Sequence, residues 1–157
     1  MCSSNALESR HVEARIQPTL VLDTNVVLDW LLFADERVLR LAAAIESGRV
    51  GWISTPHMRA ELENVLGRDI AGRSRRAMAT VLKAFDSRVQ LMAPAPACVR
   101  PSMRCDDPDD QPFIDLASHA RSIALLTRDR AVLRLAGRAL KHGFAIVVPE
   151  RWNDSVV

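Results

Sequence analysis

Four carboxylate residues stand out because each lies where a predicted strand or helix begins, ends or meets its neighbours. Asp23 follows a fully apolar run, and Asp129 follows a second largely apolar run nearer the end of the chain. Such runs are typical of strands buried on both faces in the middle of a parallel sheet. Asp110 opens a helix on its inner side, and Glu61 borders the apolar stripe of an earlier helix.

These positions predict one acidic site. In a parallel sheet, strand ends and the helix starts that follow them share one edge, so Asp23, Asp110 and Asp129 are expected to converge there. Glu61 could reach the same place from a neighbouring helix. Crowded carboxylates repel one another unless a cation neutralises them. Their oxygen ligands suit Mg²⁺ or Mn²⁺, which position and activate water for phosphodiester hydrolysis.

Each acid also has a purely structural explanation. Asp110 and Asp129 could simply cap the helices that follow them, because carboxylates are favoured at helix N-termini. Asp23 could bond nearby backbone in a turn, and Glu61 could be a solvated residue at the edge of its helix. The occurrence of four such acids at one predicted edge favours a functional site.

The elements that must position these acids alternate along the chain. Apolar runs predict strands at about 19–23, 50–54, 89–91, 122–127 and 145–148. Helices are expected between them, including one that starts at Thr55-Pro56 and one over about 130–141. This alternation predicts a three-layer α/β/α sandwich with a central, mainly parallel sheet of about five strands.

The bulk composition suits one globular domain. The chain has 157 residues and a net charge of only +2, so a nucleic-acid partner would have to meet a local basic patch. Three scattered cysteines indicate neither a zinc site nor a disulfide framework, and they favour a reducing cytoplasm. Residues 1–18 predict a flexible arm without a secretory or membrane-spanning segment, and 19–157 predict a single domain.

The acids lie in segments that resemble PIN-domain proteins of the toxin–antitoxin (VapC-like) type. The matching segments occur in the family's order and are LVLDTNVVLDWLL (20–32), STPHMRAELENVLGR (54–68), DPDDQPFIDLA (107–117) and ALLTRDRAVL (124–133). Asp-Thr-Asn after an apolar strand and the later Thr-x-Asp are the most specific parts of this resemblance.

The resemblance implies a metal-dependent ribonuclease in which a parallel sheet lies between helices. The family's four acids fall on Asp23, Glu61, Asp110 and Asp129. The resemblance further implies that Asp23, Asp110 and Asp129 hold Mg²⁺ or Mn²⁺ and that Glu61 completes the site. Asn25 and Thr127 match polar residues that support the acids.

Other residues leave alternatives open around this site. The third acid could be any of Asp106, Asp107, Asp109 and Asp110, with Asp109 the first replacement for Asp110. Gln111 stands where the family usually has Asn. Asp29 is an additional nearby acid, whereas Asp115 is expected on the opposite face of its helix. His57 and His119 are interpreted as surface or packing residues.

A run of arginines is the densest basic patch in the sequence, and its members are Arg68, Arg73, Arg75 and Arg76. It could contact RNA phosphates, dock an acidic partner or form an exposed helix flank.

These observations predict a Mg²⁺/Mn²⁺-dependent endoribonuclease of the cytoplasm that acts as the toxin of a toxin–antitoxin pair. RNA is the expected substrate and an antitoxin protein the expected partner, while a homodimer is left open. The alternative is a non-catalytic PIN-like module that binds RNA or protein, although the complete set of acids argues against it. A phosphatase with an aspartyl nucleophile would need an Asp where the chain has Asn25.

Overall fold

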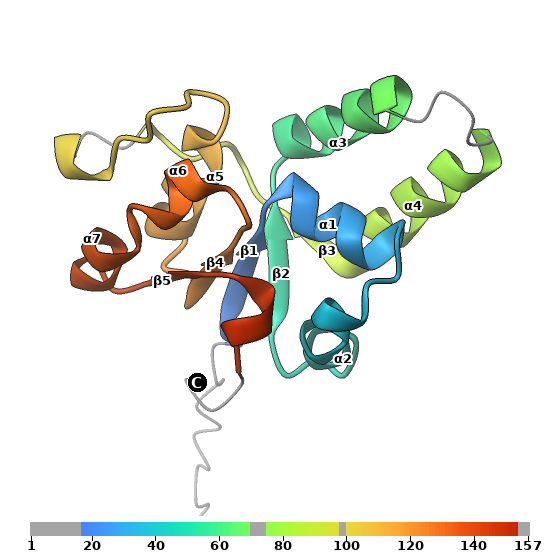
Figure 1. Cartoon of the computed structure of the whole chain (residues 1–157), viewed down its shortest axis with the longest axis horizontal. Helices are drawn as coiled ribbons and strands as arrows, with labels where there is room; N and C mark the ends of the chain where they lie inside the picture. Colours follow the sequence, from blue (N-terminus) through green and yellow to red (C-terminus); the bar gives the residue numbers. More distant parts are fainter. Residues whose placement is uncertain (1–16, 70–74, 98–99, 154–157) are drawn as a thin grey trace, which may run out of the picture.

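The sheet is built around β1 (Thr19–Leu22), which pairs on both sides with parallel strands. The computed structural model describes residues 17–69, 75–97 and 100–153. The strand order is β3-β2-β1-β4-β5, and all four adjacent pairs are parallel (Figure 1). The outer strands are β2 (Gly51–Ser54), β3 (Val89–Leu91), β4 (Ala124–Leu126) and β5 (Ala145–Val147).

Helices cover both faces of this sheet (Figure 1). One side carries α1 (Thr24–Leu31), α2 (Leu39–Glu46), α3 (Pro56–Asp69) and α4 (Arg75–Arg88). The other side carries α5 (Gln111–His119), α6 (Arg130–Leu133) and α7 (Ala136–Lys141). Short 3₁₀ helices are η1 (Glu36–Val38), η2 (Pro101–Met103) and η3 (Pro149–Arg151). The predicted three-layer α/β/α sandwich with five parallel strands is therefore confirmed.

Alternating side chains of the central strands feed two separate cores. Leu20 and Leu22 pack with Trp52 in the core under α1, α2 and α4, whereas Val21 belongs to the core under α5 to α7. The Trp52 ring meets Phe85 of α4 edge-on, with ring centroids 4.9 Å apart. Burial on both faces explains why β1 is apolar at every position after Thr19.

The order of strand addition reverses beside β1. The chain builds outward from β1 to β2 and β3, then crosses back to place β4 on the other side of β1. In open parallel sheets, such a reversal leaves a crevice beyond the carboxyl ends of the two strands, where ligands bind. The residues that follow β1 and β4 therefore define the place to look for a site.

The structure differs from one sequence prediction and leaves another untested. The helix expected over about 130–141 is two helices, α6 and α7, joined at Arg134 and Leu135. The predicted N-terminal arm falls almost entirely outside the described residues and stays a prediction, as does the single-domain assignment of 19–157. Among the described residues, no helix has the length and apolar character needed to cross a membrane.

Candidate active site

Asp23 lies at the carboxyl end of β1, directly before α1. Its backbone N–H donates to the carbonyl of Leu126 at 3.0 Å, which continues the pairing of β1 with β4. Its side chain is buried, with 5% exposed, and does not cap α1. Burial raises the pKa of Asp23, and the charge of Asp129 adds to that rise. The hydroxyl of Thr127 and the N–H groups of Asn25 and Thr24 oppose it.

Thr127 connects two of the predicted acids. Its Oγ1 donates to Asp23 Oδ2 at 2.6 Å and accepts from the backbone N–H of Asp129 at 2.9 Å. Thr127 is fully buried immediately after β4, so this bridge is held by the sheet itself. The hydroxyl thereby fixes the spacing between the two strand ends.

Asp129 caps α6, as the structural explanation proposed. Its Oδ1 accepts from the N–H groups of Ala131 at 2.6 Å and Val132 at 3.3 Å. No hydrogen bond to its second oxygen is seen among the described residues. Its charge nevertheless raises the pKa values of Asp23 and Asp110, so capping and participation in the acidic cluster are compatible.

Glu61 approaches the same edge from α3. Leu62 and Leu66 are buried and anchor α3 against the rest of the fold, while Glu61 is half-buried beside them. Its Oε1 accepts a long hydrogen bond, 3.4 Å, from the hydroxyl of Thr24 at the start of α1. Burial raises the pKa of Glu61, and the nearby charge of Asp23 raises it further.

Asp110 completes the group from the segment before α5. It occupies the N-cap position of α5, but its side chain makes no capping hydrogen bond. The pKa of Asp110 is raised to about 7. Burial is the largest cause, and the charges of Asp23, Asp129, Asp107 and Glu61 add to it in that order. A capping role alone does not account for Asp110, because its strongest electrostatic neighbours are other acids.

These mutual effects show which predicted residues the structure brings together. The charges of Asp23, Asp129 and Glu61 all raise the pKa of Asp110; Asp23 also raises that of Glu61, and Asp129 raises that of Asp23. We call these four residues the acidic cluster. It lies at the crevice beyond β1 and β4.

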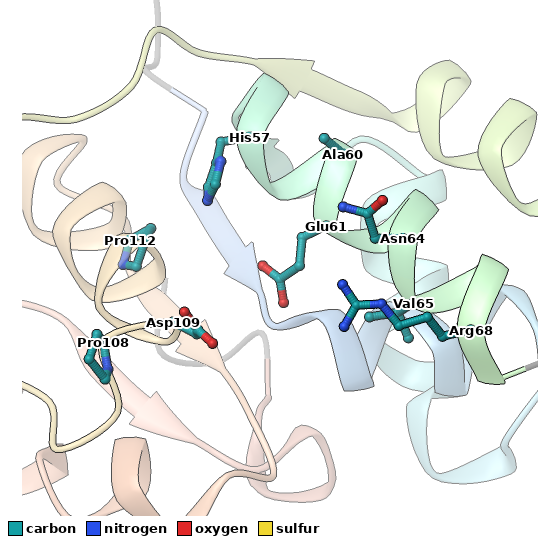
Figure 2. A pocket seen from close by; sticks show the side chains of 9 residues that line it. All are labelled: His57, Ala60, Glu61, Asn64, Val65, Arg68, Pro108, Asp109 and Pro112. Atoms are coloured by element: carbon teal, nitrogen blue, oxygen red, sulfur yellow. The ribbon is translucent and has the colours of Figure 1, made fainter.

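A pocket of about 440 Å³ adjoins the acidic cluster on the α3 side. Glu61 and Asp109 face one another across it, from α3 and from the segment before α5 (Figure 2). Arg68 points into the same pocket from the far end of α3, and His57 lines it one turn before Glu61. Asp109 is therefore a neighbour of Glu61, whereas Asp110 is electrostatically coupled to Asp23 and Asp129.

The residue after Asp110 departs from the family's pattern, and the structure shows how it is used. Gln111 Oε1 accepts from the backbone N–H of Cys105 at 2.7 Å. Gln111 Nε2 donates to Asp115 Oδ1 at 2.8 Å and to the carbonyl of Met103 at 3.2 Å. The expectation that Asp115 faces away from the core was wrong, because Asp115 is buried by this network.

Other predicted residues lie at varying distances from the acidic cluster. Asn25, which was expected to support the acids, has an exposed side chain. Its side chain makes no hydrogen bond that is seen among the described residues. Thr24 was not singled out from the sequence, yet it is buried and bonded to Glu61. Asp29 points to Arg128, with Nε and Oδ2 2.6 Å apart. His119 is exposed at the end of α5.

The arginine run is split by the fold. Arg68 lines the pocket of Figure 2, whereas Arg75 and Arg76 are exposed at the start of α4. Arg73 lies outside the described residues. Of the three members of the run that the structure describes, Arg68 alone lies beside the acidic cluster.

The donor set of the acidic cluster fits a hard divalent cation. All its ligand atoms are carboxylate oxygens, and burial together with the neighbouring negative charges raises the pKa values of Asp23, Glu61 and Asp110. Among the residues that the structure describes, however, no three Asp, Glu, His or Cys side chains already converge as metal ligands. Binding an ion would require side-chain rotation; Glu61, Asp110 and Asp129 are half-buried, whereas Asp23 is buried.

The fold and site define an α/β/α protein with acidic side chains at the ends of β1 and β4. Comparison with known proteins identifies its family. A family model of the PIN domain matches residues 19–131. The chain therefore belongs to the PIN domain family, and the resemblance inferred from the sequence is confirmed. PIN domains are generally nucleases. No curated protein matches the chain.

Solved structures share the fold at low sequence identity. VapBC2 from Rickettsia felis, bound to a DNA fragment from its promoter, aligns with a TM-score of 0.60 and 13% identity over 82% of this chain and 96% of that chain. PAE2754 from Pyrobaculum aerophilum aligns with a TM-score of 0.54 and 17% identity over 90% of this chain and 91% of that chain.

Proposed function

We propose that this protein is a Mg²⁺- or Mn²⁺-dependent endoribonuclease and the toxin of a toxin–antitoxin pair. The observation that carries the proposal is the acidic cluster, in which Asp23, Glu61 and Asp110 all have raised pKa values at the crevice beyond β1 and β4. Such crowding destabilises the carboxylates unless positive charge is supplied. A divalent cation that binds the cluster together with a phosphodiester would supply that positive charge.

Asp23, Asp110 and Asp129 would hold the ion, and Glu61 would complete the site. When bound, Mg²⁺ or Mn²⁺ supplies positive charge that screens the phosphate and lowers the pKa of water. Thr127 holds Asp23 in position through its 2.6 Å hydrogen bond. Glu61, with its raised pKa and its position beside the pocket, is suited to accept the proton of the attacking water.

The partner part of the proposal rests on the PIN family and on one structural neighbour. VapBC2 was solved as a complex bound to promoter DNA, and its fold matches this chain over most of its length. An antitoxin partner encoded nearby is therefore proposed for this chain as well. A non-catalytic PIN module remains the second candidate from a different class, and the retained acidic cluster favours the enzyme.

Two substitutions on one helix test the enzyme directly. Glu61→Gln should reduce cleavage of single-stranded RNA by at least tenfold, whereas Glu63→Gln, on the exposed side of α3, should leave it unchanged. Cleavage should stop in EDTA and return with Mg²⁺ or Mn²⁺. DNA of the same sequence, tested alongside, defines the substrate class.

Asp23→Asn gives an independent test. It should abolish cleavage while leaving the thermal midpoint the same or higher, because the substitution removes a buried negative charge from the cluster. Full activity of this variant would refute the proposed mechanism. A large fall in the midpoint would instead make Asp23 mainly structural.

A further inference from the structure

A second basic surface, on the opposite side of the sheet from Arg75 and Arg76, lies along α6, α7 and the segment around η2. It consists of exposed residues that line two neighbouring hollows, and we call it the arginine strip. Its members are Arg100, Arg104, Arg121, Arg134, Arg138 and the half-buried His142. These residues are far apart in the sequence, so no run of basic residues reveals the strip.

The two hollows of the arginine strip are joined through η2. One hollow, of about 170 Å³, is lined by Arg104, Arg134 and Arg138, and the other, of about 320 Å³, is lined by Arg100, Arg121 and His142, among others. Ser102 of η2 lies between them.

Hydrogen bonds of Ser102 form this connection. Arg138 Nη1 donates to the Ser102 carbonyl at 3.4 Å, and Ser102 Oγ lies 3.5 Å from His142 Nε2. Arg100 Nη1 lies 2.7 Å from His142 Nδ1. These contacts place the residues of the two hollows next to one another on the surface.

The strip begins at the acidic cluster. Asp129 caps α6, and Ala131, whose N–H donates to Asp129 Oδ1 at 2.6 Å, lines the first hollow of the strip together with Arg134 and Arg138. A chain molecule held at the acidic cluster could thus continue directly along the strip.

Little negative charge interrupts this surface. Among the described residues that line the two hollows, Asp106 is the only acid. It pairs with Arg134 at 2.9 Å. The side chains of Asp106 and Arg134 are 79% and 64% exposed, so this ion pair is weak and an anionic ligand can compete for Arg134. The positive potential of the strip is therefore available to an anionic ligand.

We propose that the arginine strip binds the phosphate backbone of single-stranded RNA beyond the cleavage site. This inference rests on the proposed ribonuclease function and deepens it. Arginines suit phosphate groups because they offer several donors in a fixed plane. An acidic protein would also be attracted, but protein interfaces are centred on large apolar anchors. The exposed Leu140 lies about 200° around α7 from Arg138 and so faces away from the strip.

A matched pair of triple variants tests the strip. The strip variant is Arg104→Gln/Arg134→Gln/Arg138→Gln. The control variant is Arg40→Gln/Lys83→Gln/Arg151→Gln, which removes three exposed positive charges on α2, α4 and η3. Both variants carry the same net charge, so any difference between them reports location.

Binding of a labelled 20-nucleotide single-stranded RNA is measured in EDTA over a range of salt concentrations. The strip variant should bind at least tenfold more weakly at low salt. Its slope of log affinity against log salt should fall by about two units, at about 0.7 per lost phosphate contact. The control variant should keep the slope of the native protein. Equal behaviour of the two variants would overturn the proposal.

Two further outcomes distinguish a failure of the ribonuclease proposal from a failure of the RNA-binding proposal for the strip. Native protein that binds this RNA through the strip but cleaves no RNA with Mg²⁺ or Mn²⁺ would refute the ribonuclease and leave the strip standing as a binding surface. A strip variant that binds and cleaves RNA normally but escapes inhibition by the partner protein would assign the surface to that partner, and would overturn the RNA proposal.

Discussion

The hydroxyl of Thr127 donates to Asp23 Oδ2 across 104 residues of sequence, and the 2.6 Å bond joins the ends of the two strands that flank the crevice. Asp23 is buried, so this donor offsets part of the desolvation that raises its pKa. Because the same hydroxyl accepts from the N–H of Asp129, one side chain positions two acids of the cluster.

Thr127→Val should therefore damage both stability and activity. Valine has nearly the same shape but leaves a buried carboxylate and a backbone N–H without their partner, which costs about 1–3 kcal/mol of unfolding free energy. The pKa of Asp23 should rise further, and cleavage should weaken. Urea unfolding and nuclease assays measure the two effects. Thr127→Ser, which keeps the hydroxyl, should restore most of both; equal loss in the two variants would show that the methyl group matters instead.

The titration of Asp110 should make stability depend on pH. The folded protein raises the pKa of Asp110 from 3.8 to about 7, so it holds the proton more tightly than the unfolded chain does. Stability contributed by the neutral form is complete at low pH and is lost as pH rises from about 4 through about 7.

Asp110→Asn stays neutral at every pH. Its thermal midpoint should exceed that of the native protein above about pH 7 and should match it near pH 4. Scans at several pH values in EDTA give this comparison, with Glu63→Gln as the exposed-acid control. A constant difference across the whole range would mean that hydrogen bonding or packing, and not ionisation, separates the variant from the native protein.

Divalent cations should offset the loss of stability that accompanies ionisation of Asp110. An ion that binds the folded acidic cluster stabilises it by about 2.7 kcal/mol at one hundred times its dissociation constant. Mg²⁺ or Mn²⁺ should raise the midpoint of the native protein at pH 8 and much less at pH 5, because protonated carboxylates do not bind metal. Asp23→Asn should lose most of the shift. Equal shifts in both proteins would place the ion elsewhere.

The layout of this fold was predictable because it depends on local patterns. Fully apolar runs marked β1 and β4, and Thr55-Pro56 marked the start of α3. The acids at strand ends followed from the rule that parallel strands share one edge. The resemblance favoured Asp110 over its acidic neighbours, but its burial and its electrostatic coupling to Asp23 and Asp129 depend on three-dimensional positions.

Other features were beyond sequence reasoning because they depend on long-range contacts. Thr24 belongs to the Asp-Thr-Asn motif, but its bond to Glu61 could not be foreseen, since that bond joins α1 to α3. Asp115 was assigned to the outer face by helical spacing, but Gln111 makes burial of that carboxylate tolerable by donating to it. The arginine strip joins residues from η2, α7 and the turn after α5, so only the tertiary fold assembles it.

Arg128 lies between the two residues that meet at the crevice, Thr127 and Asp129, and is itself held from both sides. Its Nε is 2.6 Å from Asp29 Oδ2, and its Nη1 is 2.5 Å from Glu150 Oε1. Arg128→Met should cost about 1–3 kcal/mol of unfolding free energy, because two partly buried carboxylates lose their charged donor. It should also reduce cleavage by loosening the turn after β4.

Arg37→Met is the matched control for that change. Arg37 lies 3.7 Å from Glu150 and pairs with Asp35, but its side chain is 59% exposed. Its loss should cost little stability, because solvent screens this exposed pair, and should leave cleavage intact. Chemical denaturation and nuclease assays on both variants check the pair. Equal effects on cleavage would show that the position of Arg128 next to Thr127 and Asp129 has no special role.

The position of Arg68 predicts that the arginine run does not act as a unit. Arg68 lines the pocket with Glu61 and Asp109, whereas Arg75 and Arg76 are exposed on α4 (Figure 2). Arg68→Ala should raise the KM for RNA several-fold with a smaller effect on kcat, because it removes a positive charge that meets the substrate before cleavage. Arg75→Ala/Arg76→Ala should change neither KM nor kcat by more than about twofold.

If that double variant cleaves normally but also escapes inhibition, the start of α4 docks the antitoxin. If it weakens KM as much as Arg68→Ala does, the RNA path runs outward along α4, and the pocket is not its only entrance.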